Sequence, residues 1–235
     1  TDAVRRFSLA TLAKGALARA HSPHYPWDSA AMLAQQGLLG IPFPEQDGGQ
    51  GGTLMHAVLA IQEVAQVCPR SADIVQAGNF GPIRTFVEYA TPEQKARYLP
   101  RLATGEMIAA FCLTESGAGS DAASIRTSAK ANGDGSFTLS GEKIWITNGG
   151  IADLYTVFAR TEGDAGRITA FVVEAGWPGV SRGKHEDKMG IRASSTTTVA
   201  FADVRVPAEN VLGEPGKGFK VAMGILNNGR TGLGG

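Results

Sequence analysis

The sequence predicts an α+β fold with an N-terminal helical domain, a middle antiparallel β-domain of barrel or sandwich type, and a further helix at the C-terminal end. Up to about residue 103, apolar residues recur at spacings of three and four, which is the period of a helix face. From residue 107 the pattern changes to short apolar runs separated by turn residues, and helical periodicity returns at 218–233. We therefore expect domains at 1–105 and 106–215, and a helix within 216–235.

Two helices are expected early in the first domain. Asp28 is placed to cap a helix that runs through Leu39, because the turn-rich stretch 42–52 must end it. A second helix fits residues 53–67, where apolar residues again follow helical spacing.

Thr91 gives the clearest helix start in the chain. Pro92 follows at the first helical position, and Gln94 lies three residues after the cap, which is the pattern of a capping box. We expect this helix to end at about Leu99, because Pro100 removes a backbone donor and disfavours a helical residue before it.

The middle domain is predicted from short strands and turn chemistry. The run Asn132-Gly133-Asp134-Gly135 is typical of a hairpin turn. Gly117-x-Gly119 does not indicate a dinucleotide-binding βαβ unit, because no third glycine falls in register and no long amphipathic helix follows. Strands at this spacing favour an antiparallel barrel or sandwich. The candidate strands are 107–113, 124–130, 137–139, 143–146, 154–160, 168–174 and 197–201.

Composition argues against several classes of function. The 22 basic and 22 acidic residues balance to zero net charge, so nothing supports nucleic-acid binding. Apolar runs are far shorter than the ~20 residues of a transmembrane helix, and no secretory signal opens the chain. Cys68 and Cys112 favour buried free thiols over a disulfide. His21 and His24 have a metal-compatible interval, but no third ligand lies nearby, so no metal site is expected.

The most informative feature is a pair of polar segments. Residues 111–121 read Phe-Cys-Leu-Thr-Glu-Ser-Gly-Ala-Gly-Ser-Asp, and residues 143–150 read Lys-Ile-Trp-Ile-Thr-Asn-Gly-Gly. Together they offer backbone N–H groups, hydroxyls and an indole, which suit a flat, anionic, hydrogen-bonding cofactor such as a flavin dinucleotide. Glu115 and Asp121 flank the glycines, where turn hydrogen bonds are the expected role of a carboxylate.

This pair, in its order and separation, resembles the acyl-CoA dehydrogenase family. Further matching stretches lie at 91–102, 188–194, 204–213 and 218–230, and the ending Asn-Asn-Gly-Arg is most similar to the very-long-chain branch. The resemblance implies FAD-dependent conversion of a fatty acyl-CoA to the trans-2-enoyl-CoA, with hydride passing to flavin N5 and electrons to an electron-transfer flavoprotein. It implies that residues 216–235 are the first helix of a C-terminal helical bundle, most of which is absent from this chain. It also implies a homodimer or homotetramer, in the cytoplasm of a bacterium or in the mitochondrial matrix of a eukaryote.

The resemblance places the cofactor on both segments. Thr147 is expected near flavin N5, Thr114 at the pyrimidine side and Ser120 at the phosphates, with Trp145 packed against the rings. Ser116 departs from the family, in which a proline commonly follows the Thr-Glu pair, and should loosen the turn by up to ~1 kcal/mol. The implied cofactor-binding residues are Phe111, Cys112, Leu113, Thr114, Gly119, Ser120, Trp145, Ile146 and Thr147.

The same resemblance places the acyl thioester and CoA beside the last helix. Arg230 suits a CoA phosphate or a structural carboxylate equally well. Gly229 stands where the isovaleryl and long-chain branches carry a glutamate base, and glycine cannot remove the α-proton of a thioester. We therefore assign no catalytic residue and expect the base in the absent C-terminal region. The implied substrate-binding residues are Ser120, Asn227, Asn228, Gly229 and Arg230.

Two other functions remain open on the same scaffold. An acyl-CoA oxidase would reoxidise the flavin with oxygen, and a non-catalytic assembly or binding protein would need no base. The segment 76–82 matches the part of the family that shapes the acyl tunnel, although a simple turn between helices explains its small residues nearly as well.

Overall fold

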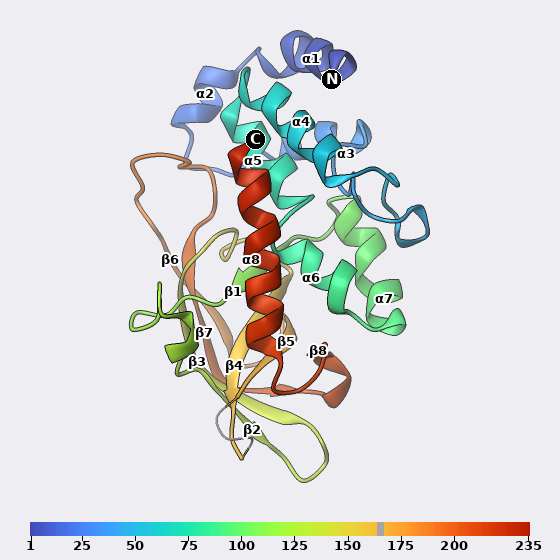
Figure 1. Cartoon of the computed structure of the whole chain (residues 1–235). Helices are drawn as coiled ribbons and strands as arrows, with labels where there is room; N and C mark the ends of the chain where they lie inside the picture. Colours follow the sequence, from blue (N-terminus) through green and yellow to red (C-terminus); the bar gives the residue numbers. More distant parts are fainter. Residues whose placement is uncertain (164–166) are drawn as a thin grey trace.

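Helices and sheet occupy opposite ends of the molecule, and a long helix, α8 (Gly218–Gly234), runs from beside β5 and β8 into the helical end (Figure 1). The computed structural model describes residues 1–163 and 167–235. The predicted order of helices, then strands, then a final helix is confirmed. The domain limits at residues 105 and 215 stay a prediction.

The helical end is built from short elements around a shared apolar core. Its most deeply buried side chains include Leu33, Val64 and Phe80. The helices are α1 (Asp2–Phe7), a π-helix (Ser8–Leu12), α2 (Ala16–His21), α3 (Trp27–Gln35), α4 (Leu54–Ala65), α5 (Pro69–Ala77), α6 (Pro82–Tyr89) and α7 (Pro92–Ala103). Among the described residues, none of these helices has the length and apolar character needed to cross a membrane.

Two details of the early helices differ from expectation. The N-cap of α3 is Pro26, so Asp28 lies in the first turn, where its charge faces the positive end of the helix dipole. The helix ends at Gln35, four residues before the expected Leu39, because a turn follows at 36–37, where Gly37 adopts a φ of 65°. The expected second helix is confirmed as α4, whose N-cap is Thr53.

Helix α7 confirms the predicted start and overturns the predicted end. Thr91 Oγ1 accepts the Gln94 N–H at 3.2 Å, and Gln94 Oε1 accepts the Thr91 N–H at 3.0 Å. The helix continues through Pro100 to Ala103. An interior proline costs about 3 kcal/mol, but Leu99 and Leu102 are buried, at about 1.5–3 kcal/mol for each side chain. Core packing therefore outweighs the proline.

The strands form one sheet with the order β6-β7-β3-β2-β4-β5-β8, and β1 pairs with β4. The expected antiparallel pairing is confirmed for most of the sheet, and β1 and β2 add parallel pairings to β4 that the sequence did not predict. Such pairings need long connections. The strands are β1 (Ala109–Cys112), β2 (Ser128–Ala131), β3 (Phe137–Ile146), β4 (Leu154–Thr161), β5 (Ile168–Glu174), β6 (Val180–His185), β7 (Thr197–Val206) and β8 (Val211–Leu212).

Strand β3 merges two of the predicted strands. Its register with β7 shifts around Gly141, whose φ is 151°, so a bulge joins the halves that the sequence separated. The predicted turn before β3 is confirmed, with Gly135 at φ 83° and Asp134 Oδ1 accepting the Ser136 N–H at 3.1 Å. Strand β6 was missed because it is mostly exposed and lacks apolar alternation.

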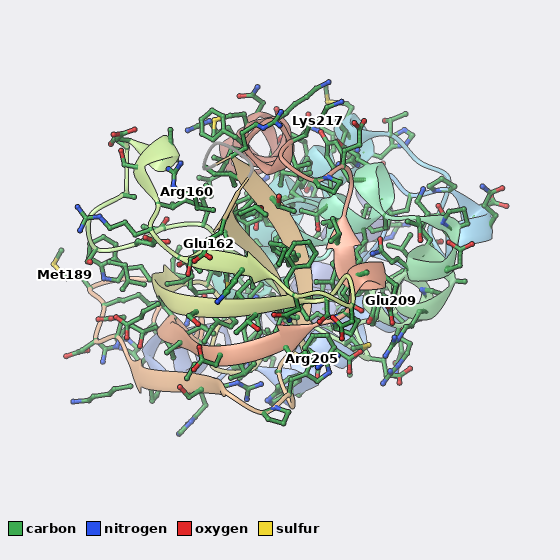
Figure 2. The ribbon with its side chains drawn as sticks, turned by 90° about the horizontal axis from the view of Figure 1, so that it is seen from below. Arg160, Glu162, Met189, Arg205, Glu209 and Lys217 are labelled. Carbon is green, nitrogen blue, oxygen red and sulfur yellow. The ribbon has the colours of Figure 1, made fainter. Side chains whose placement is uncertain are left out.

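The connection from β6 to β7 projects from the sheet. In the view from below, Met189 points away from the rest of the molecule at the tip of this connection (Figure 2). Its base is held in place by Lys188, whose Nζ donates to Ser194 O at 2.8 Å and to Thr196 Oγ1 at 2.6 Å.

Candidate functional site

A cleft of about 400 Å³ lies where the helical end and the sheet meet α8. One wall is the turn between α5 and α6, from Gln76 to Pro82. The second wall combines Phe111 and Thr114 at the end of β1 with residues 145–148 at the end of β3. The face of α8 that carries Ile225, Gly229 and Leu233, at helical spacing, closes the third side. Residues far apart in the sequence therefore share one hollow.

The two polar segments singled out in the sequence are bonded to each other at the cleft. The Ile144 N–H donates to Thr114 O at 2.9 Å. Lys143 Nζ donates to Leu113 O at 3.1 Å and to Glu115 Oε1 at 2.8 Å. We call residues 111–121 and 143–148, joined in this way, the shelf.

Glu115 and Lys143 form the buried foundation of the shelf. Lys143 is fully buried and Glu115 is 8% exposed. The Glu115 carboxylate also accepts the N–H groups of Arg126 at 2.6 Å and Thr127 at 3.0 Å, and the Thr127 hydroxyl at 2.6 Å. Burial opposes the charge on Glu115, but Lys143 and these donors hold the pKa of its carboxyl below the usual value. The pair is therefore a structural cross-link.

The turn-forming role expected of the carboxylates is supported by these contacts. Glu115 bonds backbone groups of the following turn, and Asp121 accepts the hydroxyl of Ser124. The role of Lys143 was missed by sequence reasoning, because an isolated lysine in a strand gives no signal that it is buried.

An irregular backbone turns two side chains of the shelf outward. The register of β3 breaks between Lys143 and Ile146, and Trp145 adopts a φ of 55°. Positive φ is a strained conformation for a bulky side chain and is found chiefly at functional sites. As a result Trp145 is 64% exposed at the cleft, and Thr147 is exposed beside it.

The glycine loop of the shelf is open. A tight turn joins Glu115 and Ala118 through two backbone hydrogen bonds of 3.2 and 3.0 Å. A Cβ added to Gly117 or Gly119 would meet nothing within 4 Å. Within the described part of the chain, the N–H groups of Gly117, Gly119 and Ser120 have no hydrogen-bond partner. These donors are free to bind an anionic ligand.

The structure brings most of the predicted site residues together. Side chains of Cys112 and Leu113 instead lie in the core, and burial raises the pKa of the Cys112 thiol. Gly119 and Ser120 are exposed and lie outside the lining of the cleft. The predicted residues that line it are Phe111, Thr114, Trp145, Ile146, Thr147, Gly229 and Arg230.

The two asparagines predicted to bind substrate do not line the cleft. Asn227 is exposed, and Asn228 donates to Glu88 Oε1 at 3.0 Å, which ties α8 to α6. The roles assigned to individual residues stay predictions.

Cys68 and Cys112 are both free and buried.

Asn148 is a lining residue that the sequence did not single out. Its φ is 60°, a conformation that asparagine tolerates, and its Oδ1 is buried without a partner among the described residues. The expected acyl segment 76–82 does contribute to the wall. No carboxylate belongs to the described lining of the cleft, and a Cβ added to Gly229 would meet nothing within 4 Å.

The described residues contain no cluster of side chains that could bind a metal ion. They contain no group of three His, Cys, Asp or Glu side chains close enough to hold an ion. His185 Nε2 lies 3.1 Å from Ser195 Oγ, which makes it a local contact of the β6–β7 connection.

Comparisons with known proteins agree with this geometry. Residues 1–106 match the family model "Acyl-CoA dehydrogenase, N-terminal domain", and residues 110–204 match "Acyl-CoA dehydrogenase, middle domain". The short-chain specific acyl-CoA dehydrogenase of Clostridium acetobutylicum is 43% identical over 212 residues, which are 89% of this chain and 55% of that protein. The mitochondrial very long-chain specific acyl-CoA dehydrogenase of Macaca fascicularis is 48% identical over 209 residues, which are 86% of this chain and 32% of that protein.

A solved structure extends the likeness to three dimensions. It is described as an acyl-CoA dehydrogenase from Bacillus anthracis complexed with FAD, and it has a TM-score of 0.89 at 37% identity. The match covers 99% of this chain and 40% of that one. The chain thus spans little more than half, at most, of the length of these three proteins.

Proposed function

The chain belongs to the acyl-CoA dehydrogenase family, and from this premise we propose that the intact protein binds FAD on the shelf and dehydrogenates an acyl-CoA thioester between its α and β carbons. The observation that carries the proposal is the junction of the two polar segments, through the Ile144–Thr114 hydrogen bond of 2.9 Å and Lys143, beside a cleft closed by α8. Either segment alone would be an ordinary loop.

The residues of the shelf fit a flavin dinucleotide. Trp145 offers an exposed flat face, and Thr114 and Thr147 offer hydroxyls to the polar edge of a ring. The unpartnered N–H groups of Gly119 and Ser120 suit a pyrophosphate. Bound there, FAD supplies an acceptor for two electrons and a proton from the substrate.

The residues of the chain have three tasks in this proposal. Phe111 and Ile146 exclude water from the reacting carbons, because they line the cleft with apolar surface. Arg230 places a permanent charge at the edge of the cleft, suited to a CoA phosphate. The base that removes the α-proton comes from outside this chain, since Gly229 has no side chain and the described lining has no carboxylate.

The destination of the electrons is part of the proposal. We infer transfer to an electron-transfer flavoprotein, as in the family, and assembly as a homodimer or homotetramer that completes the dinucleotide site. An oxidase on the same scaffold would use oxygen instead. Hydrogen peroxide released by the substrate-reduced protein in air, without any added acceptor, would favour the oxidase.

Anaerobic titration tests the activity directly. The intact protein reconstituted with FAD is mixed with acyl-CoA thioesters of several chain lengths, and flavin absorbance is followed. Bleaching with formation of the enoyl-CoA is expected, because the reduced flavin loses its visible band. Absence of bleaching with every thioester would reject the proposal.

A non-catalytic binding protein is the second candidate, and the lack of a carboxylate in the described lining favours it. It predicts that FAD binds while every thioester leaves the flavin oxidised. The two candidates therefore separate in the same titration, provided that bound FAD is measured first.

A further inference from the structure

The turn at the end of the shelf carries Thr147 and Asn148. Residues 147–152 lead from β3 to β4, and we call them the exit turn. Within it, Asn148 O accepts the N–H groups of Ile151 at 3.0 Å and Ala152 at 2.8 Å. Asn148 has a φ of 60°, and a residue other than glycine keeps such a conformation only where its surroundings hold it. The way Thr147 faces the cleft therefore depends on what holds the exit turn.

Arg182, on the edge strand β6, bonds this turn with all three of its guanidinium nitrogens. One terminal nitrogen donates to Gly150 O at 3.2 Å, and the other donates to Ala152 O at 2.7 Å. Its Nε donates to the Tyr155 hydroxyl at 2.8 Å, and that hydroxyl donates to Gly149 O at 2.8 Å. One side chain thus holds three carbonyl groups of the exit turn, two directly and one through Tyr155.

The exit turn is also packed tightly against β7 and the end of β6. The Gly150 N–H donates to Ser195 O at 3.3 Å. A Cβ added to Gly150 would clash with Ser195 Oγ and lie 2.9 Å from His185 Nε2, and one added to Gly149 would lie 2.8 Å from Thr197 Oγ1. The turn has no room to move closer to these strands, so the bonds from Arg182 determine how far it can move away.

The chemistry of Arg182 suits this task better than that of a lysine would. A guanidinium presents its donors in fixed directions within one plane, whereas a lysine ammonium is a single point of charge. The guanidinium forms no ion pair within the part of the chain that the structure describes, and its hydrogen bonds go to the exit turn and Tyr155. Burial raises the pKa of the Tyr155 hydroxyl, which therefore keeps the proton that it donates to Gly149 O.

We propose that Arg182 is a positioning residue of the flavin site, which fixes the exit turn and so sets how closely the Thr147 hydroxyl approaches the bound flavin. The proposal rests on the FAD binding proposed above and adds a residue from outside the described lining of the cleft. The polar edge of a flavin gains negative charge on reduction, so hydrogen bonds to it become stronger. A displaced Thr147 should therefore weaken binding of the reduced form more than binding of the oxidised form.

Amide hydrogen exchange of the intact protein, before FAD is added, tests the local contacts. Arg182→Met and Tyr155→Phe should each speed exchange at Ile151 and Ala152 about tenfold relative to the amides of β5, because the turn opens more often. Lys184→Met is the matched control, since it removes the same charge from an exposed position on β6 that has no hydrogen bond among the described residues. Exchange in Arg182→Met that equals the control would overturn the proposal.

Flavin binding separates a positioning role from a structural one. In equilibrium dialysis, Arg182→Met should bind FAD about tenfold more weakly than wild type. The midpoint potential of the bound flavin should also fall by about 30 mV, which is a tenfold change in the ratio of the affinities for the two forms in a two-electron couple. Lys184→Met should match wild type in both measurements. A lower unfolding midpoint with unchanged FAD affinity and potential would show a purely structural role and overturn the proposal.

The conservative variant and the wild type decide the remaining outcomes. Arg182→Lys keeps the charge but cannot bond three groups at once, so it should recover only part of the affinity and potential. Full recovery would show that charge alone acts and would overturn the proposal. If wild type binds no FAD, the proposed function fails and this inference fails with it. If wild type binds FAD and Arg182→Met behaves as Lys184→Met does, only this inference fails.

Discussion

Two buried cations in this protein, Lys143 and Arg70, differ in whether hydrogen-bond partners replace the water that each loses on folding. Lys143 is fully buried, and its ammonium donates to Glu115 Oε1 at 2.8 Å and to Leu113 O at 3.1 Å. Arg70 is 7% exposed, and its guanidinium has no partner among the described residues. Both groups lose their hydration on folding, but only Lys143 regains hydrogen bonds inside the chain. The first cation holds the shelf together, and the second makes no hydrogen bond among the described residues.

The largest effect is expected at Lys143. Lys143→Met leaves the Glu115 carboxylate buried without its counter-ion, which costs about 3–5 kcal/mol of unfolding free energy. Urea denaturation of the intact protein measures this loss. Lys130→Met, at an exposed lysine, is the control and should stay within about 0.5 kcal/mol of wild type. A loss at Lys143 as small as that at Lys130 would break the comparison.

Substitution of Arg70 is expected to change the free energy of unfolding in the opposite direction. Arg70→Met removes a buried charge that makes no hydrogen bond among the described residues, so the free energy of unfolding should rise by about 1–3 kcal/mol. The same urea series measures both variants in one buffer. If Arg70→Met also loses stability, the two cations are equivalent and the comparison fails.

Gly141 tests how closely the Glu115 network depends on its geometry. A Cβ at this position would lie 2.6 Å from Thr127 Oγ1 and 2.8 Å from Thr127 Cα, and the φ of 151° is itself unfavourable for alanine. Gly141→Ala should therefore cost about 1–3 kcal/mol, by strain and by displacing Thr127 from Glu115. Gly119→Ala, where a Cβ meets nothing within 4 Å, should be nearly neutral in thermal unfolding. If Gly141→Ala is no more destabilising than Gly119→Ala, the Glu115 network tolerates the displacement of Thr127.

The smallest effect is a pH dependence from Glu115. The folded-state pKa of this carboxyl is lowered from its value in the unfolded chain, near 4.3. Its ionised form therefore stabilises the protein above that pH, and this contribution disappears as the pH falls through the lower, folded-state pKa. The stability difference between wild type and Glu115→Gln should be greatest near neutral pH and shrink below about pH 4. A difference that grows in acid would contradict the assignment.

Local signals in the sequence were sufficient for elements that depend on neighbouring residues. The capping box at Thr91, the turn before β3 and strand β5 all follow from short patterns and appear as expected. The helix through Pro100 and the exposed strand β6 did not follow, because tertiary packing and sheet pairing decide them. Such contacts join residues that no local window contains.

The candidate site likewise contains features that the sequence predicted and features that only the fold decides. The two polar segments of the shelf were predicted from their residues and from the family resemblance. The roles of Lys143 and Asn148 were not predicted, because burial gives these residues their importance and burial is set by the fold. A single lysine or arginine in a sequence does not reveal whether its partner exists.

Affinity for FAD is the measurement that tests the shelf most directly. Equilibrium dialysis compares the intact wild-type protein with Trp145→Leu and with Trp27→Leu, a control at another exposed tryptophan that lies outside the cleft lining. Loss of the indole face should weaken FAD binding about tenfold, or about 1.4 kcal/mol, and the control should bind as wild type does. Unchanged affinity in Trp145→Leu would contradict the claim that the shelf holds the flavin.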